Sequence, residues 1–150
     1  MISVVQRVTR GAVDVDGKTV GSIDAGMVAL VAVMKGDTDA DVQWMADKLS
    51  TIRMFRSADG EKHFDLDVRQ AGGSILLVSQ FTLAADTRRG RRPSFDPAAP
   101  PEQARALFDA LVRAVAERGI SVATGQFAAD MKVSLINDGP VTFIVNSKQP

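Results

Sequence analysis

The 150-residue sequence contains no cysteine and only one histidine, His63. The lack of cysteine excludes disulfides, thiolate metal sites and a cysteine nucleophile, and it fits a reducing compartment. A serine–histidine–aspartate triad would have to use His63, which lies in a polar stretch where a lone histidine is more often solvated than catalytic. Because no second histidine accompanies the carboxylates and no phosphate-binding glycine loop or dinucleotide fingerprint is present, we expect neither a metal nor a cofactor.

The chain also lacks an excess of either charge and a long apolar run. Lysine plus arginine number 18, as do aspartate plus glutamate, so no global basic field attracts nucleic acid and any RNA contact needs a local patch. No apolar stretch approaches the roughly 20 residues that span a bilayer, and the first residues do not have the pattern of a signal peptide. We therefore expect a single cytoplasmic domain over residues 1–150 with no membrane partner.

Apolar, β-branched runs predict that the chain is rich in strands. Asp16-Gly17 lies between two such runs and is a strong signal for a tight hairpin. The predicted strands cover residues 2–9, 12–15, 18–20, 27–34, 74–81, 121–123, 131–136 and 141–145, the last two forming a final hairpin.

Two segments have helical periodicity. Thr38, followed by Asp41, forms a capping-box-like start for a helix of about four turns. Pro101 suits the first turn of a second helix, which Gly119 ends. The fold class is therefore predicted to be α+β: one domain with a mostly antiparallel sheet, curled toward a barrel, and two main helices packed on it.

Two short segments are candidates for a functional site. Asn137-Asp138-Gly139-Pro140-Val141-Thr142 joins the last two predicted strands, and on local grounds it is an ordinary turn, since only about 5–6% of X-Pro bonds are cis. Ser79-Gln80-Phe81-Thr82-Leu83 stands at the end of another apolar strand. A threonine nucleophile needs a neighbouring base, and none is evident. An enzyme built this way would act by positioning and by backbone donors, on a substrate that is reactive or carries its own catalytic group.

A basic cluster follows the second segment. It consists of Arg88, Arg89, Arg91 and Arg92. A charge run is usually a solvated loop, but arginine held between Gly90 and Pro93 makes phosphate contact an equal alternative. Phosphate beside a hydroxyl-lined strand end suggests the terminus of a nucleic acid, placed so that its last nucleotide enters a pocket.

Taken in order, several segments resemble the D-aminoacyl-tRNA deacylase (D-tyrosyl-tRNA(Tyr) deacylase) family from end to end. They are Gln6-Arg7-Val8, Gln70 to Gly73, Ser79 to Thr87, Arg92 to Phe95, Gly125 to Met131 and Asn137 to Thr142. The resemblance implies hydrolysis of the ester bond of D-aminoacyl-tRNA, and of glycine mischarged on tRNA(Ala), at the 3′-terminal adenosine. It also implies a homodimer with active sites at the subunit interface.

The resemblance further implies that a cis Gly139–Pro140 bond from one subunit enters the pocket of the other and rejects L-amino acids. Asn137, Val141 and Thr142 belong to the same selectivity segment, and Arg7 is expected to hold it. We assign catalysis to the segment Ser79, Gln80, Phe81 and Thr82: backbone N–H groups near Phe81 and Thr82 stabilise the oxyanion, while the 2′-hydroxyl of the RNA assists attack by water. Two alternatives stay open: an esterase with Thr82 as nucleophile, and a non-catalytic nucleic-acid-binding module.

Overall fold

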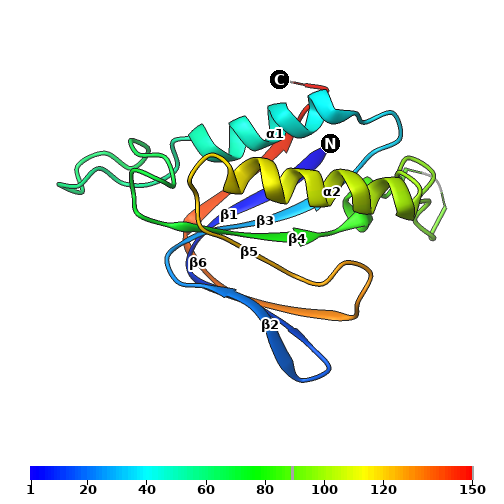
Figure 1. Cartoon of the computed structure of the whole chain (residues 1–150), viewed down its shortest axis with the longest axis horizontal. Coiled ribbons are helices and arrows are strands. Elements are labelled where there is room, and N and C mark those ends of the chain that lie inside the picture. Colours follow the sequence, from blue (N-terminus) through cyan, green and yellow to red (C-terminus); the bar gives the residue numbers. More distant parts are fainter. Residues whose placement is uncertain (89, 150) are drawn as a thin grey trace.

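The computed structural model describes residues 1–88 and 90–149, which form a curled sheet with helices on one face (Figure 1). Two α-helices, α1 and α2, pack against each other over the sheet, and a 3-10 helix, η1, follows the fourth strand. The elements are β1 (Ile2–Val15), β2 (Lys18–Ile23), β3 (Gly26–Ala32), α1 (Asp39–Thr51), β4 (Ser74–Ser79), η1 (Phe81–Ala84), α2 (Pro101–Ala116), β5 (Val122–Thr124) and β6 (Met131–Asn146).

The sheet follows the order β2-β1-β3-β4-β5, with β6 on the other side of β1. Strand β1 is antiparallel to β2, β3 and β6, whereas β3–β4 and β4–β5 are parallel. The predicted mostly antiparallel, barrel-like sheet with two helices is therefore confirmed. The curl brings β2 against β5 so closely that a Cβ on Gly21 would lie 2.1 Å from the carbonyl oxygen of Thr124, and only glycine fits there.

The main core lies between the sheet and the two helices. Val5, Met27 and Leu77 from the strands are fully buried against Leu49 of α1 and Leu111 of α2. Each such side chain contributes about 1.5–3 kcal/mol relative to its exposed state. A smaller buried cluster, which includes Val13 of β1 and Leu76 of β4, lies apart from this main core.

The predicted final hairpin is wrong. Residues 131–146 form one strand, β6, that runs along β1 for its whole length: 131–136 pair with 10–15, and 142–146 pair with 2–6. The two halves therefore pair with β1 and not with each other. The turn residues between them produce a local irregularity beside Val8, because the 14 residues of β1 offer a continuous partner that overrides the local turn signal.

Other boundaries differ less from the prediction. The strand predicted over 74–81 ends at Ser79 because the chain turns into η1, and the strands predicted over 2–9 and 12–15 are one strand. The hairpin at Asp16-Gly17 is confirmed, with positive φ angles of 50° and 75°, as is the capping box between Thr38 and Asp41. Within the described residues, no helix has the length and apolar character needed to cross a membrane.

Candidate functional site

A pocket of about 490 Å³ opens where β4 ends. One wall is the segment Ser79–Phe81, and a second is the start of α2, with Ala104 and Phe108. Residues 127–129 and the first residues of β6 close the remaining sides. The walls are mainly apolar and the polar groups lie together at the end of β4, an arrangement typical of pockets that bind small organic groups.

The segment after β4 presents two backbone donors beside this pocket. Gln80 N–H donates to the carbonyl of Val31 at 2.7 Å, which fixes the start of η1 on strand β3. The N–H groups of Phe81 and Thr82 donate to no backbone carbonyl in the described structure, as expected for the first residues of a helix. The Gln80 side-chain amide donates to Thr82 Oγ1. The hydroxyl of Thr82 is thus engaged by an amide rather than by a base.

The second predicted segment is an irregular, unpaired stretch within β6, called here the Gly139–Pro140 loop, and the buried side chain of Arg7 anchors it. The Gly139–Pro140 peptide is cis and both residues are exposed. Arg7 is only 3% exposed, and its Nε donates to the Asp138 carbonyl at 3.0 Å. Arg7 Nη1 also donates to the Met54 carbonyl at 2.6 Å. A single buried guanidinium therefore joins this loop to the segment that follows α1.

Asn137 anchors the loop from its other side. Its Nδ2 donates to the carbonyl of Arg7 at 2.9 Å and to the carbonyl of Val141 at 3.1 Å. Val141 is buried, while Thr142 is exposed and accepts a hydrogen bond from Gln6 at 3.3 Å. Hydrogen bonds of this kind fix the position of the exposed backbone without using a side chain of Gly139 or Pro140.

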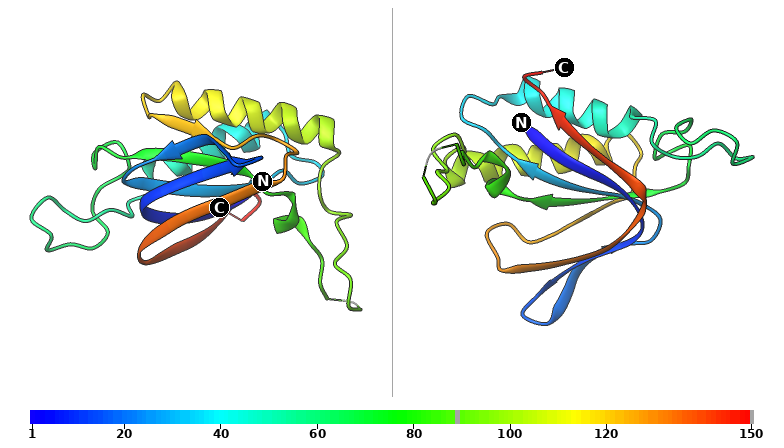
Figure 2. Two further views of the ribbon diagram at one scale, coloured as in Figure 1. Left: turned by 90° about the horizontal axis from the view of Figure 1, so that it is seen from below. Right: turned by 180° about the vertical axis from the view of Figure 1, so that it is seen from behind.

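The two segments do not meet within one chain. Ser79, Gln80 and Phe81 line the pocket, whereas neither Gly139 nor Pro140 does. Figure 2 shows β6, which carries the loop, running along the outer side of the sheet beside β1. The pocket lining of one chain therefore does not combine the two segments.

The predicted arginine cluster lies on an arm between η1 and α2. Reciprocal backbone hydrogen bonds of 2.8 and 2.9 Å join Asp86 and Ser94 at the base of the arm. Arg88 donates to both carboxylate oxygens of Asp86, and these hydrogen bonds hold the pKa of that carboxyl well below its usual range. Arg91 and Arg92 are exposed, and Arg89 lies outside the described residues.

His63 is exposed and lies away from the pocket lining, with its Nδ1 2.8 Å from Nη1 of Arg56. Nowhere in residues 1–88 or 90–149 do three histidine or carboxylate side chains gather in a way that could hold a metal ion.

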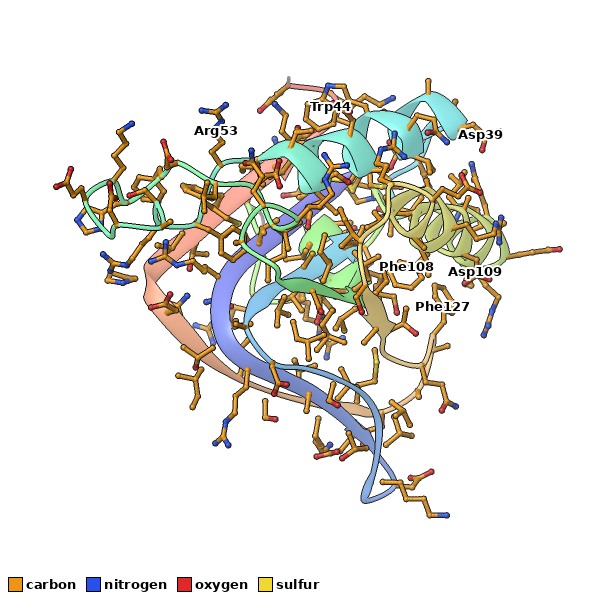
Figure 3. The ribbon with its side chains drawn as sticks, turned by 60° about the vertical axis from the view of Figure 1, so that its left-hand side comes forward. Asp39, Trp44, Arg53, Phe108, Asp109 and Phe127 are labelled. Atoms are coloured by element: carbon orange, nitrogen blue, oxygen red, sulfur yellow. The ribbon has the colours of Figure 1, made fainter. Side chains whose placement is uncertain are left out.

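The far wall of the pocket could not be predicted from the sequence. Phe108 of α2 and Phe127 face each other there with ring centroids 6.3 Å apart (Figure 3). Arg105 stacks over Phe127, its guanidinium carbon 4.7 Å from the ring centroid. Helical periodicity identifies Phe108 only as a core residue. The positive φ of 62° at Ala128, which turns the chain beside Phe127, has no signal in the sequence.

Comparison with known proteins gives consistent matches along the chain. The family described as D-Tyr-tRNA(Tyr) deacylase matches residues 4–146. A D-aminoacyl-tRNA deacylase of Geobacter sulfurreducens is 52% identical over 99% of this chain and 96% of its own. One from Methylococcus capsulatus is 56% identical over 97% of this chain and 94% of its own.

Two solved structures share the fold. The c-Myc DNA unwinding element binding protein has a TM-score of 0.92 at 35% identity, covering 97% of this chain and 98% of its own. A probable eukaryotic D-amino acid tRNA deacylase has a TM-score of 0.83 at 17% identity, covering 96% of this chain and 97% of its own, and at that identity it supports the fold alone.

Proposed function

We propose how two exposed segments of this chain, which belongs to the D-Tyr-tRNA(Tyr) deacylase family and is a D-aminoacyl-tRNA hydrolase, contribute to the reaction. The segment Ser79–Thr82 performs the hydrolysis, and the Gly139–Pro140 loop discriminates between D- and L-amino acids. Two observations support the proposal. The backbone N–H groups of Phe81 and Thr82 donate to no backbone carbonyl, and among the described residues no base contacts the Thr82 hydroxyl.

Hydrolysis begins when water attacks the ester carbonyl and negative charge develops on its oxygen. The N–H groups of Phe81 and Thr82 stabilise that oxyanion, and a donor of this kind is worth about 10²–10³ in rate. The neighbouring 2′-hydroxyl of the terminal ribose assists the attacking water, so the protein does not need to supply a nucleophile. The ester C–O bond then breaks, and the free D-amino acid and the tRNA leave.

The apolar pocket holds the 3′-terminal adenosine beside this segment. Its volume of about 490 Å³ and its largely apolar walls suit a nucleoside. Phe81, which is 58% exposed and packs edge-on to Phe95 at a centroid distance of 5.0 Å, stands at the mouth. A rigid aromatic pair there orients the ribose toward the donors.

The homodimer completes the site, because one chain does not bring its own Gly139 and Pro140 to its pocket. Strand β6 also exposes apolar side chains that a second copy would cover: Val133 is 37% exposed, Ile136 47% and Ile144 78%. Exposed apolar side chains grouped on one strand are typical of a protein interface. In the dimer, the loop of one subunit enters the pocket of its partner.

Handedness is then judged by exclusion. With the amino group and the ester carbonyl fixed, the substituents of L- and D-amino acids point to opposite sides of Cα. Backbone carbonyls of the Gly139–Pro140 loop, held in place by Arg7 and Asn137, occupy the L side and clash with any L side chain. D-amino acids of many kinds are accepted, and glycine, including glycine mischarged on tRNA(Ala), is hydrolysed because it has no side chain to reject.

The exposed arginines of the arm contact phosphates of the acceptor end. Arg91 and Arg92 lie on the loop that leads from the pocket mouth, and guanidinium groups suit phosphate geometry. Since the net charge of the chain is zero, this patch supplies the attraction, and binding weakens with salt.

A second candidate function is a non-catalytic nucleic-acid-binding module. A similar solved structure is named as a DNA unwinding element binding protein, at 35% identity. Such a module would use the same arginine arm and would release neither D- nor L-amino acid from tRNA, and the membership of this chain in a family of hydrolases argues against it.

Thr82→Ala tests the hydrolytic mechanism against the esterase alternative. The variant keeps the backbone N–H, so we expect D-aminoacyl-tRNA hydrolysis within about tenfold of the wild-type kcat. Single-turnover hydrolysis of D-tyrosyl-tRNA, with tRNA binding measured in parallel, decides the question. Complete loss of chemistry with intact tRNA binding would instead make Thr82 a nucleophile.

A further inference from the structure

Among the described residues, one arginine stacks on an aromatic ring of the pocket wall. The hydrolytic mechanism gives this arginine no role. Arg105 is exposed on α2, and its guanidinium carbon lies 4.7 Å from the centroid of Phe127, which lines the pocket. Its Nη2 also donates to the Phe127 carbonyl at 3.5 Å. Phe127 in turn packs against Phe108 across the pocket wall (Figure 3).

Arg105 has acidic neighbours on its own helix that it does not use. Glu102 precedes it by three residues and Asp109 follows by four, the spacings at which helical side chains pair. None of the salt bridges among the described residues involves Arg105. The carboxylate of Asp130, three residues after Phe127 in the chain, pairs with Lys132 at 3.0 Å. The guanidinium therefore keeps its charge uncompensated by a close carboxylate at the pocket rim.

The stack also holds the guanidinium in place before any ligand arrives. A cation lying on an aromatic face loses rotamer freedom in the free protein, so less entropy is lost when its remaining N–H groups bind an anion. The planar fork of arginine suits two oxygens of a phosphate. The guanidinium of Arg105 is thus already positioned to bind one phosphate next to the pocket.

We propose that Arg105 binds the 5′-phosphate of the terminal nucleotide, the phosphodiester that links it to the rest of the acceptor end. This inference rests on the proposed placement of the terminal adenosine in the pocket. With the ribose ester at the Phe81–Thr82 donors and the phosphate at Arg105, the nucleotide is held at two points from opposite walls. Arg105 is thus a positioning residue and takes no part in bond breaking.

Two small probes isolate this contact from the rest of the tRNA. Adenosine 5′-monophosphate and adenosine differ only in the phosphate, so the ratio of their dissociation constants measures it. At low salt we expect the wild-type protein to bind the monophosphate about five- to tenfold more tightly, and we expect the advantage to shrink in 0.5 M salt because the site is exposed.

Arg105→Gln should bring that ratio close to one while leaving the affinity for adenosine unchanged. Arg113→Gln is the matched control, and it should keep the wild-type ratio. Arg113 is also exposed on α2, but among the described residues only Arg105 stacks on Phe127 of the pocket wall. On D-tyrosyl-tRNA, Arg105→Gln should raise KM with kcat unchanged. A wild-type protein that binds both probes equally, or an unchanged ratio in Arg105→Gln, would overturn the inference.

These outcomes are separable from failure of the proposed function. If the wild-type protein bound the monophosphate preferentially but hydrolysed no D-aminoacyl-tRNA, the hydrolytic proposal would fail and the phosphate contact would stand. If hydrolysis were normal and the probe ratio did not depend on Arg105, only the phosphate contact would fail.

Discussion

The Gly139–Pro140 loop and the arginine arm are both exposed, yet they are held in opposite ways. The loop is fixed by a buried guanidinium and by an asparagine amide that reach backbone carbonyls on both sides of it. Two backbone hydrogen bonds between Asp86 and Ser94 close the arm at its base. The ion pair between Arg88 and Asp86 joins residues two positions apart in the chain. A segment fixed by partly buried hydrogen bonds suits the rejection of one mirror image, whereas an exposed arm that carries arginines suits contact with a long, variable RNA.

The largest effect should come from removing the anchor of the loop. Arg7→Ala leaves the carbonyls of Met54 and Asp138 without their donor, and we expect a loss of about 3 kcal/mol in the free energy of unfolding. Urea denaturation measures this loss. Because the loop then keeps only its anchor from Asn137, hydrolysis of L-tyrosyl-tRNA should rise relative to D-tyrosyl-tRNA. An unchanged D/L ratio in folded Arg7→Ala would show that the anchor does not set selectivity.

A smaller effect, confined to binding, should follow from reversing charge on the arm. Arg91→Glu combined with Arg92→Glu should raise KM for aminoacyl-tRNA about tenfold at low salt and flatten its salt dependence, with stability unchanged. The D/L ratio should stay at the wild-type value, since the arm does not judge handedness. Equal salt slopes for variant and wild type would remove these arginines from the RNA contact.

The smallest effect supplies a control for stability alone. Asp41 lies in the first turn of α1. Burial raises its pKa, but hydrogen bonds from Lys148, Ser147 and Thr38 lower it by more, so the net pKa is well below the usual value. A depressed carboxyl pKa adds stability above the unfolded pKa of about 4, and this stability is lost as pH falls below that value.

Asp41→Asn should therefore cost about 1 kcal/mol at pH 7 and reduce the fall in stability between about pH 4 and pH 2. Thermal unfolding across that range measures the change. Unlike Arg7→Ala, this variant should keep the wild-type D/L ratio. A shift in selectivity equal to that of Arg7→Ala would mean that general destabilisation, and not the anchor, loosens the loop.

The sequence predicts the elements well where the signal is local. The Asp16-Gly17 hairpin, the capping box at Thr38 and the buried run that becomes β4 depend on neighbouring residues, and each is found in the structure. The single strand β6 could not be predicted in this way. Its continuity depends on pairing with β1, more than a hundred residues away in the chain, while Gly139-Pro140 signals a turn.

The site shows the same division. The two signature segments are identified by their resemblance to the deacylase family, since on local grounds Gly139-Pro140 indicates only an ordinary turn. The buried bonds from Arg7 to backbone carbonyls and the wall formed by Phe108 and Phe127 carry no such signal, because carbonyl acceptors are available at every position and aromatic residues at helical spacing indicate only a core.

Rejection of L-amino acids by the Gly139–Pro140 backbone is tested by the hydrolysis of D-alanyl-, L-alanyl- and glycyl-tRNA by the purified wild-type chain under identical conditions. If the backbone of the loop excludes L side chains, D-alanine should be released rapidly, glycine should be released at a measurable rate, and essentially no L-alanine should be released. Release of L-alanine at the rate of D-alanine would contradict it.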